Sequence, residues 1–150
     1  MSLASDIAVL RRVPFFERFG DEHLRLLAFG GENQHHDEDT TLFRVGDPTE
    51  GGFVILSGQI RLTDGSHEDE GERFKVGTLL GQRALLAPTK RRHTAIAVSR
   101  VEVLLIRRSL FVRMLSEFPD LAAQLRAEMA DELRNLTGRA AVVVSGRRPL

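Results

Sequence analysis

The stretch VGTLLGQRALLAPTKRRHTAIAV, residues 76–98 of this 150-residue chain, decides the fold. Gly77 and Gly81 permit sharp turns and let a ligand approach the backbone closely. Residues 82–86 can form one short helical turn whose free N–H groups point toward the loop before it. A helix N-terminus that follows a glycine favours a bound anion. The stretch therefore predicts an anion pocket next to Gly81.

Three consecutive cations follow the short turn. Lys90, Arg91 and Arg92 are close enough in sequence to fold back and neutralise the anion. Arginine suits a phosphate because its planar fork donates two parallel hydrogen bonds. A run of charge is also typical of a solvated turn between two strands. The glycine loop and helical turn beside it favour the pocket over that interpretation.

Short β-type segments lie on both sides of this stretch. They are rich in Val, Ile, Leu, Phe and Thr and are separated by Gly, Pro, Asp and Ser. Such segments indicate an all-β barrel or sandwich rather than alternating strands and helices. The polar, acidic residues 64–72 indicate a mobile hairpin loop. The predicted strands are 41–45, 52–56, 59–63, 73–76, 95–99 and 101–106.

Helices are predicted before and after the β region. Residues 4–29 carry apolar side chains at helical spacing, interrupted by Pro14, and Asp21 is the expected N-cap of the second part. After the strands, Ser109 is expected to cap a helix over residues 110–115. The sequence therefore predicts a barrel flanked by helices at both ends of the chain.

The last predicted helix begins at Pro119, runs to about Thr137 and stops at Gly138. Its apolar side chains recur at steps of three and four, so this stripe either packs on the barrel or forms the seam of a two-helix dimer. About two heptads are too few for an independent coiled coil. The stripe consists of Ala122, Leu125, Met129, Leu133 and Leu136.

Composition limits the classes of function. Lys plus Arg and Asp plus Glu number 21 each, so the chain lacks the basic excess of a stand-alone DNA-binding protein. No apolar run is long enough to span a membrane, and no cysteine is present for a disulfide or a thiolate metal site. We expect a cytoplasmic domain over residues 1–138, with residues 139–150 as a tail and no contact with DNA or membrane.

Neither a catalytic nor a metal-binding pattern is evident in the sequence. His35 and His36 precede three acidic residues, but neighbours in an extended segment point to opposite sides, so a polar surface loop is expected there. The serines lack an elbow motif, and the sequence has no His-x-His pair of a metal-dependent barrel enzyme. We therefore expect no enzyme, no metal and no cofactor.

The cation-rich stretch resembles the phosphate-binding cassette of cyclic-nucleotide-binding domains. That cassette has the pattern Gly-Glu-x-Ala-Leu, a short gap, and an arginine followed by small residues; here GQRALL (81–86) is followed by RRHTA (91–95). LRRVPFFERFGDEHLRLLA (10–28) and LFRVGDPTEGGFVILSGQIRL (42–62) are similar to the family's N-terminal helices and barrel strands. The resemblance covers about residues 7–137. It implies a double-stranded β-helix, a jelly-roll-like barrel with N-terminal helices and two C-terminal helices.

The resemblance assigns roles to individual residues. The amides of Gly81 and Ala84 would face the cyclic phosphate, and Arg91 would pair with it, with Arg92 beside the purine. A register one residue longer would make Arg92 the phosphate ligand and His93 its neighbour. The match of the strands that follow favours Arg91.

Two positions depart from the family pattern. Gln82 stands where the family has its ribose-binding glutamate, and it keeps an acceptor oxygen but loses the charge, for a loss on the order of 1–2 kcal/mol, or roughly tenfold in affinity. Arg83 stands where an apolar residue is usual, so its charge must reach solvent or find a partner.

The implied function is that of a cyclic-nucleotide sensor, a regulatory module that acts through an unidentified protein partner or a homodimer formed by the 119–137 helix. Cyclic AMP is expected ahead of cyclic GMP, because Arg92 replaces a small hydroxyl residue that helps to bind guanine. The alternative is a domain that kept the fold, lost the nucleotide and serves as a dimerisation or docking module.

Overall fold

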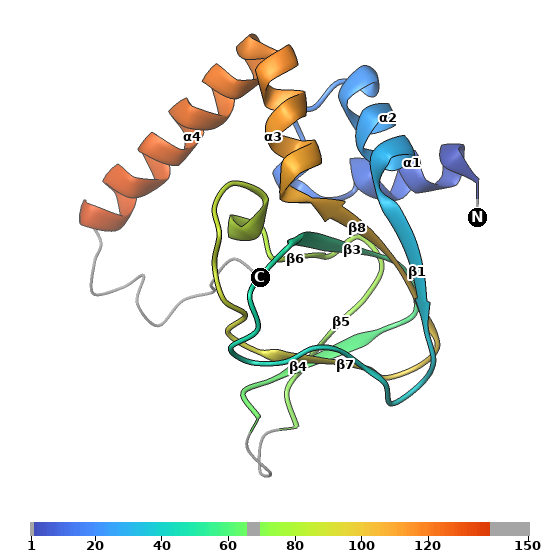
Figure 1. Cartoon of the computed structure of the whole chain (residues 1–150). Coiled ribbons are helices and arrows are strands. Elements are labelled where there is room, and N and C mark those ends of the chain that lie inside the picture. Colours follow the sequence, from blue (N-terminus) through green and yellow to red (C-terminus); the bar gives the residue numbers. More distant parts are fainter. Residues whose placement is uncertain (1, 66–69, 139–150) are drawn as a thin grey trace.

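The computed structural model describes residues 2–65 and 70–138. Two four-stranded antiparallel sheets face each other as a jelly-roll barrel, with strand orders β1-β8-β3-β6 and β2-β7-β4-β5 (Figure 1). The predicted fold class is therefore confirmed. The strands are β1 (Glu32–His36), β2 (Thr41–Phe43), β3 (Gly51–Ser57), β4 (Ile60–Thr63), β5 (Glu72–Phe74), β6 (Leu79–Leu80), β7 (Thr94–Ala97) and β8 (Val101–Arg107).

Helices gather at one end of the barrel. Figure 1 shows α1, α2 and α3 side by side there, whereas α4 leaves the end of α3 and runs past the loop that carries the short turn η2. The break at Pro14 is confirmed, because a 3-10 turn begins there. The helical elements are α1 (Leu3–Arg11), η1 (Pro14–Phe16), α2 (Asp21–Gly30), η2 (Arg83–Leu85), α3 (Arg108–Glu117) and α4 (Pro119–Gly138).

Strand β1 corrects the prediction of a surface loop at His35 and His36. The segment ENQHH is entirely polar, yet it pairs with β8 along its whole length, from Glu32 opposite Leu105 to His36 opposite Val101. Pairing of the backbone with a strongly apolar neighbour outweighs the side-chain pattern at this sheet edge. The two-residue strand β6 was likewise not predicted, and it joins the cation-rich stretch to β3.

Both predicted side-chain caps are wrong. Gly20 is the N-cap of α2, with Asp21 inside the helix, and the Gly20 N–H donates to Nδ1 of His23 at 2.9 Å. Arg107 is the N-cap of α3, so Ser109 also lies inside its helix. Strand β8 passes directly into α3 with no loop between them, and no residue is left over for a side-chain cap.

The core has two apolar clusters. One lies between the two sheets and contains Ile60, Leu80 and Val103, among others. The other lies beneath the helices and includes Leu121 and Leu125 of α4. The first part of the α4 stripe therefore packs on the domain, whereas Met129 is 47% exposed. The side chains of Leu133 and Leu136 lie outside the described set, as does the tail at 139–150.

The predicted hairpin between β4 and β5 is present, with Ile60 opposite Phe74. The loop of this hairpin was predicted over residues 64–72; of these, residues 66–69 lie outside the described residues, and Glu72 begins β5. Among the helices of residues 2–65 and 70–138, none has both the length and the apolar content needed to cross a membrane.

Candidate functional site

A pocket of about 210 Å³ opens at the end of the barrel beside η2. Its walls come from strands of both sheets, from η2, and from the loop that leads into β7. Three arginines, one lysine and one histidine line it, together with apolar and threonine side chains, and no acidic residue within 2–65 or 70–138 does. The lining residues are Phe43, Thr49, Leu62, Leu80, Gly81, Arg83, Ala84, Thr89, Lys90, Arg91, Arg92 and His93.

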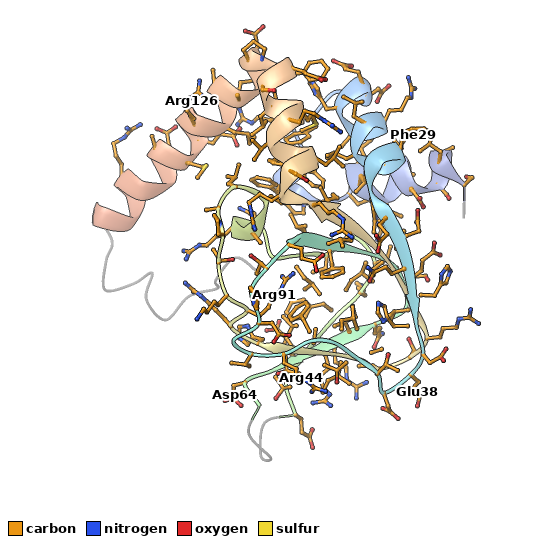
Figure 2. All side chains as sticks on the ribbon, in the orientation of Figure 1. Phe29, Glu38, Arg44, Asp64, Arg91 and Arg126 are labelled. Carbon is orange, nitrogen blue, oxygen red and sulfur yellow. The ribbon has the colours of Figure 1, made fainter. Side chains whose placement is uncertain are left out.

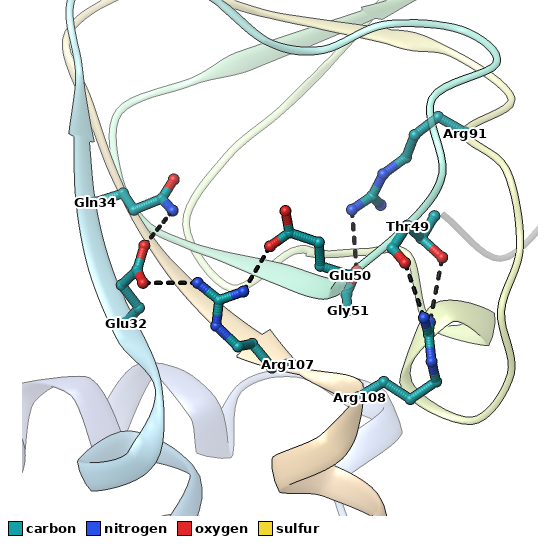
Figure 3. A network of polar contacts seen from close by, with 8 residues as sticks. All are labelled: Glu32, Gln34, Thr49, Glu50, Gly51, Arg91, Arg107 and Arg108. Atoms are coloured by element: carbon teal, nitrogen blue, oxygen red, sulfur yellow. Dashed lines mark hydrogen bonds and ion pairs between the residues drawn. The ribbon is translucent and has the colours of Figure 1, made fainter.

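The Arg91 side chain lies inside the barrel wall (Figure 2) and is only 8% exposed. Its guanidinium carbon is 4.1 Å from the centre of the Phe43 ring and 5.3 Å from that of Phe53. Its Nη2 donates to the Gly51 carbonyl at 3.0 Å (Figure 3). Two aromatic rings and one carbonyl therefore hold the guanidinium in place without using all its donors.

Backbone pairing explains why Arg91 points inward. The Arg91 N–H donates to the Asp47 carbonyl, and the Gly46 N–H donates to the Arg91 carbonyl, both at 2.8 Å. Residues of an extended segment alternate between two sides. Arg91 is accordingly buried, while Lys90 and Arg92 on either side of it are exposed at the pocket mouth.

The charge of Arg91 lacks an ion-pair partner among the described residues. Burial lowers the pKa of Arg91 to about 10, against the opposing attraction of Glu50 and Asp47. Glu50 bonds Arg107 at 2.7 Å, and Asp47 accepts from the Arg44 N–H at 2.9 Å. A buried charge without a paired partner is costly, and a bound anion would relieve that cost.

The turn η2 places backbone N–H groups beside this cation. Gly81 has φ of +93°, and a Cβ atom there would lie 2.6 Å from Nη1 of Arg91, so glycine is required on both counts. The Ala84 N–H donates to the Gly81 carbonyl at 3.0 Å within the turn. The N–H groups of Gln82 and Arg83 come first in the turn and have no partner within it.

The structure brings four of the five candidate site residues to the pocket. Gly81, Ala84, Arg91 and Arg92 line it, whereas Gln82 does not and is half-buried beside it. Arg83, named in the sequence only as a departure, lines the pocket instead. Position 82 therefore contributes nothing to the lining in this conformation, and its neighbour adds a cation.

Two further residues organise the site and were missed from the sequence. Arg108, at the start of α3, donates from Nη1 to the carbonyls of Ala84 at 2.8 Å and Ala87 at 3.2 Å. Its Nη2 donates to the Thr49 carbonyl at 2.9 Å (Figure 3). The Thr49 hydroxyl, 3.0 Å from that of Thr89, lies in the pocket wall. Only the fold brings these residues together, since 24 residues separate Arg108 from Ala84.

The two histidines of β1 do not line the pocket and contact other side chains instead. His36 Nε2 lies 3.0 Å from the Gln34 side-chain oxygen, and His35 Nε2 lies 3.8 Å from the Glu102 carboxylate. Within residues 2–65 and 70–138, no three His, Asp or Glu side chains are arranged as metal ligands.

Comparison with known proteins agrees with this geometry. The family model described as "Cyclic nucleotide-binding domain" matches residues 33–118. A cyclic nucleotide-binding-like protein from Brucella abortus is 38% identical with a TM-score of 0.67, over 74% of this chain and 97% of that one. The N-terminal domain of a transcriptional regulator from Streptomyces coelicolor is 26% identical with a TM-score of 0.79, over 87% and 93% of the two chains.

One relative found by sequence is named as the regulatory subunit of a protein kinase. The cAMP-dependent protein kinase regulatory subunit of Colletotrichum orbiculare is 26% identical over 106 residues, which are 71% of this chain and 27% of that protein. The chain spans between 6% and 27% of the length of the curated relatives it matches. The family match covers more than half of the chain and contains every residue that lines the pocket. The chain therefore belongs to the cyclic nucleotide-binding domain family.

Proposed function

We propose that this domain is a non-catalytic sensor that binds a cyclic nucleotide, with cyclic AMP preferred over cyclic GMP, and acts on a protein partner or a second copy. The observation that carries the proposal is the buried Arg91 guanidinium, which faces a pocket that no carboxylate of the described residues lines. A cyclic phosphate would supply the missing anion and accept the donors that Arg91 leaves unused.

The proposed response to the ligand begins at η2. A phosphate held by Arg91 and by the first N–H groups of the turn would draw the two together. Arg108 donates to the Ala84 carbonyl of η2 and is the first residue of α3, so a shift of the turn would be transmitted to α3. We propose that α4 then closes over the base. Binding shifts this equilibrium only by its differential affinity for the two states.

Titration calorimetry tests the proposal directly. Cyclic AMP is expected to bind one site with a dissociation constant on the order of micromolar. Cyclic GMP is expected to bind more weakly, and 5′-AMP at least about tenfold more weakly, since its open phosphate does not reproduce the cyclic diester. No heat with any of the three, on protein shown by circular dichroism to be folded, would contradict the sensor and leave the docking module.

Replacing Arg108 with glutamine is expected to affect both the fold and the site. A hydrogen bond to a charged group is worth about 1.5–3 kcal/mol, and the glutamine amide can remake part of the three bonds to carbonyls, so we expect the free energy of unfolding to fall by about 2 kcal/mol. Cyclic AMP affinity is expected to fall about tenfold, because η2 loses its tie to α3. Denaturation followed by circular dichroism and calorimetry would measure the two effects.

The neighbouring residue supplies a matched control. Arg107 is 48% exposed in its side chain and pairs with Glu32 and Glu50 on the surface. Exposed ion pairs contribute about 0–1 kcal/mol, so Arg107→Gln is expected to cost less than about 1 kcal/mol and to leave cyclic AMP affinity unchanged. Equal effects of Arg107→Gln and Arg108→Gln would contradict the role given to Arg108.

A further inference from the structure

The mouth of the pocket carries more positive charge than one cyclic phosphate can balance. Arg83, Lys90, Arg91 and Arg92 line a single opening, and His93 lies beside them. Among the residues that the structure describes, no aspartate or glutamate lines this opening. A cyclic mononucleotide has one negative charge, and Arg91 alone suffices to pair with it.

The inner cation is already partly balanced. Glu50 and Asp47 both attract the Arg91 charge, although each is bonded to another group. Among the described residues, none forms an ion pair with the three outer cations. The three rim cations therefore add unpaired positive charge at the mouth to that of the buried Arg91, which also forms no ion pair with a described residue.

The fold fixes where these rim cations stand. Segment 89–91 is held against 46–49 by backbone bonds, among them Thr49 N–H to the Thr89 carbonyl at 3.0 Å. Lys90 and Arg92 are two residues apart in this extended segment and so face the same outer side. Arg83 reaches the opening from η2. Three cations thus converge on one opening from two separately anchored elements.

We infer that the ligand of this pocket carries a second phosphate group, bound at the rim by Arg83, Lys90 and Arg92. The inference rests on the proposed function, with Arg91 holding the first phosphate inside. Two kinds of nucleotide have the required chemistry: a cyclic dinucleotide, with two phosphodiesters, and a mononucleotide bisphosphate. In both, the two phosphates belong to one molecule, so a single ligand in this pocket could contact Arg91 and the rim cations together.

The test compares adenine ligands that differ in their phosphates. At about 50 mM salt, where exposed charges interact over more than 10 Å, cyclic di-AMP or adenosine 3′,5′-bisphosphate is expected to bind at least about tenfold more tightly than cyclic AMP. The preference is expected to shrink to about threefold or less near 500 mM salt, because the rim is solvent-exposed. Whichever of the two binds more tightly shows whether the second phosphate belongs to a cyclic dinucleotide or to a mononucleotide bisphosphate.

Variants test whether the rim cations cause the preference for a second phosphate. The triple replacement Arg83→Gln, Lys90→Gln and Arg92→Gln is expected to reduce the preference for the second phosphate to about twofold or less. Arg100→Gln removes one exposed cation outside the pocket lining and is expected to keep the tenfold preference.

Three outcomes would overturn the inference, and only one of them also overturns the sensor. If cyclic AMP binds and neither doubly phosphorylated ligand binds more tightly, the rim is not a phosphate subsite and the proposed function stands. If the preference survives the triple replacement, the second phosphate lies elsewhere. If no ligand binds the folded protein at any salt concentration, the proposed function fails together with the inference.

Discussion

Replacing Arg91 with glutamine is expected to lower cyclic AMP affinity at least about 100-fold while the ligand-free domain keeps its stability. Removing one partner of a buried, hydrogen-bonded charge pair costs about 3–5 kcal/mol, which sets the loss of binding. In the free domain Arg91 is a buried charge with no ion pair to a described residue, so removing that charge stabilises the fold. This gain offsets the loss of the guanidinium contacts with Phe43 and Phe53. We expect the free energy of unfolding to change by less than about 1 kcal/mol.

Two companion variants distinguish the geometry from the charge. Arg91→Lys keeps the charge but not the planar fork, and it is expected to recover only part of the affinity. Arg92→Gln removes an exposed cation, and we expect it to lower cyclic AMP affinity less than about fivefold. A larger loss with Arg92 than with Arg91 would show that the register one residue longer is correct. Calorimetry on the three variants, with denaturation curves for each, decides the matter.

The sequence predicted the local part of the pocket, whereas Phe43, Thr49 and Leu62 of its lining come from distant segments. Gly81, Ala84, Arg91 and Arg92 lie within one stretch of 12 residues, and their spacing resembles a known cassette. The burial of Arg91 and the exposure of Arg92 then follow from the alternation of one extended segment.

The parts that the sequence did not predict depend on contacts between distant segments. Strand β1 has no apolar alternation, and it exists because β8 offers its edge. Thr49 and Arg108 have ordinary polar side chains whose roles arise when β3, η2 and α3 meet. Single-sequence patterns report periodicity and local turns, and they carry little information on such encounters.

Phe111→Ala is expected to produce a large loss of stability. Phe111 is fully buried in α3, and its ring lies 6.1 Å from those of both Phe15 and Phe19. Truncation of a buried phenylalanine leaves a cavity and typically costs 3–5 kcal/mol. We expect the free energy of unfolding to fall by about 4 kcal/mol and the melting temperature by roughly 10 °C, since each kcal/mol shifts a domain of this size by about 2–4 °C. The chain has no tryptophan or tyrosine, so circular dichroism is the suitable probe.

Phe29→Ala is the matched control, because it makes the same substitution at an exposed position of α2. Its side chain is 82% exposed, and Phe29→Ala is expected to change the free energy of unfolding by no more than about 0.5 kcal/mol. Similar small effects of both replacements would mean that α3 is not packed against the N-terminal helices. Because Arg108 joins that same helix to η2, the proposed route from pocket to α4 requires α3 to be firmly seated. A small effect of Phe111→Ala would therefore weaken the transmission mechanism as well as the account of the core.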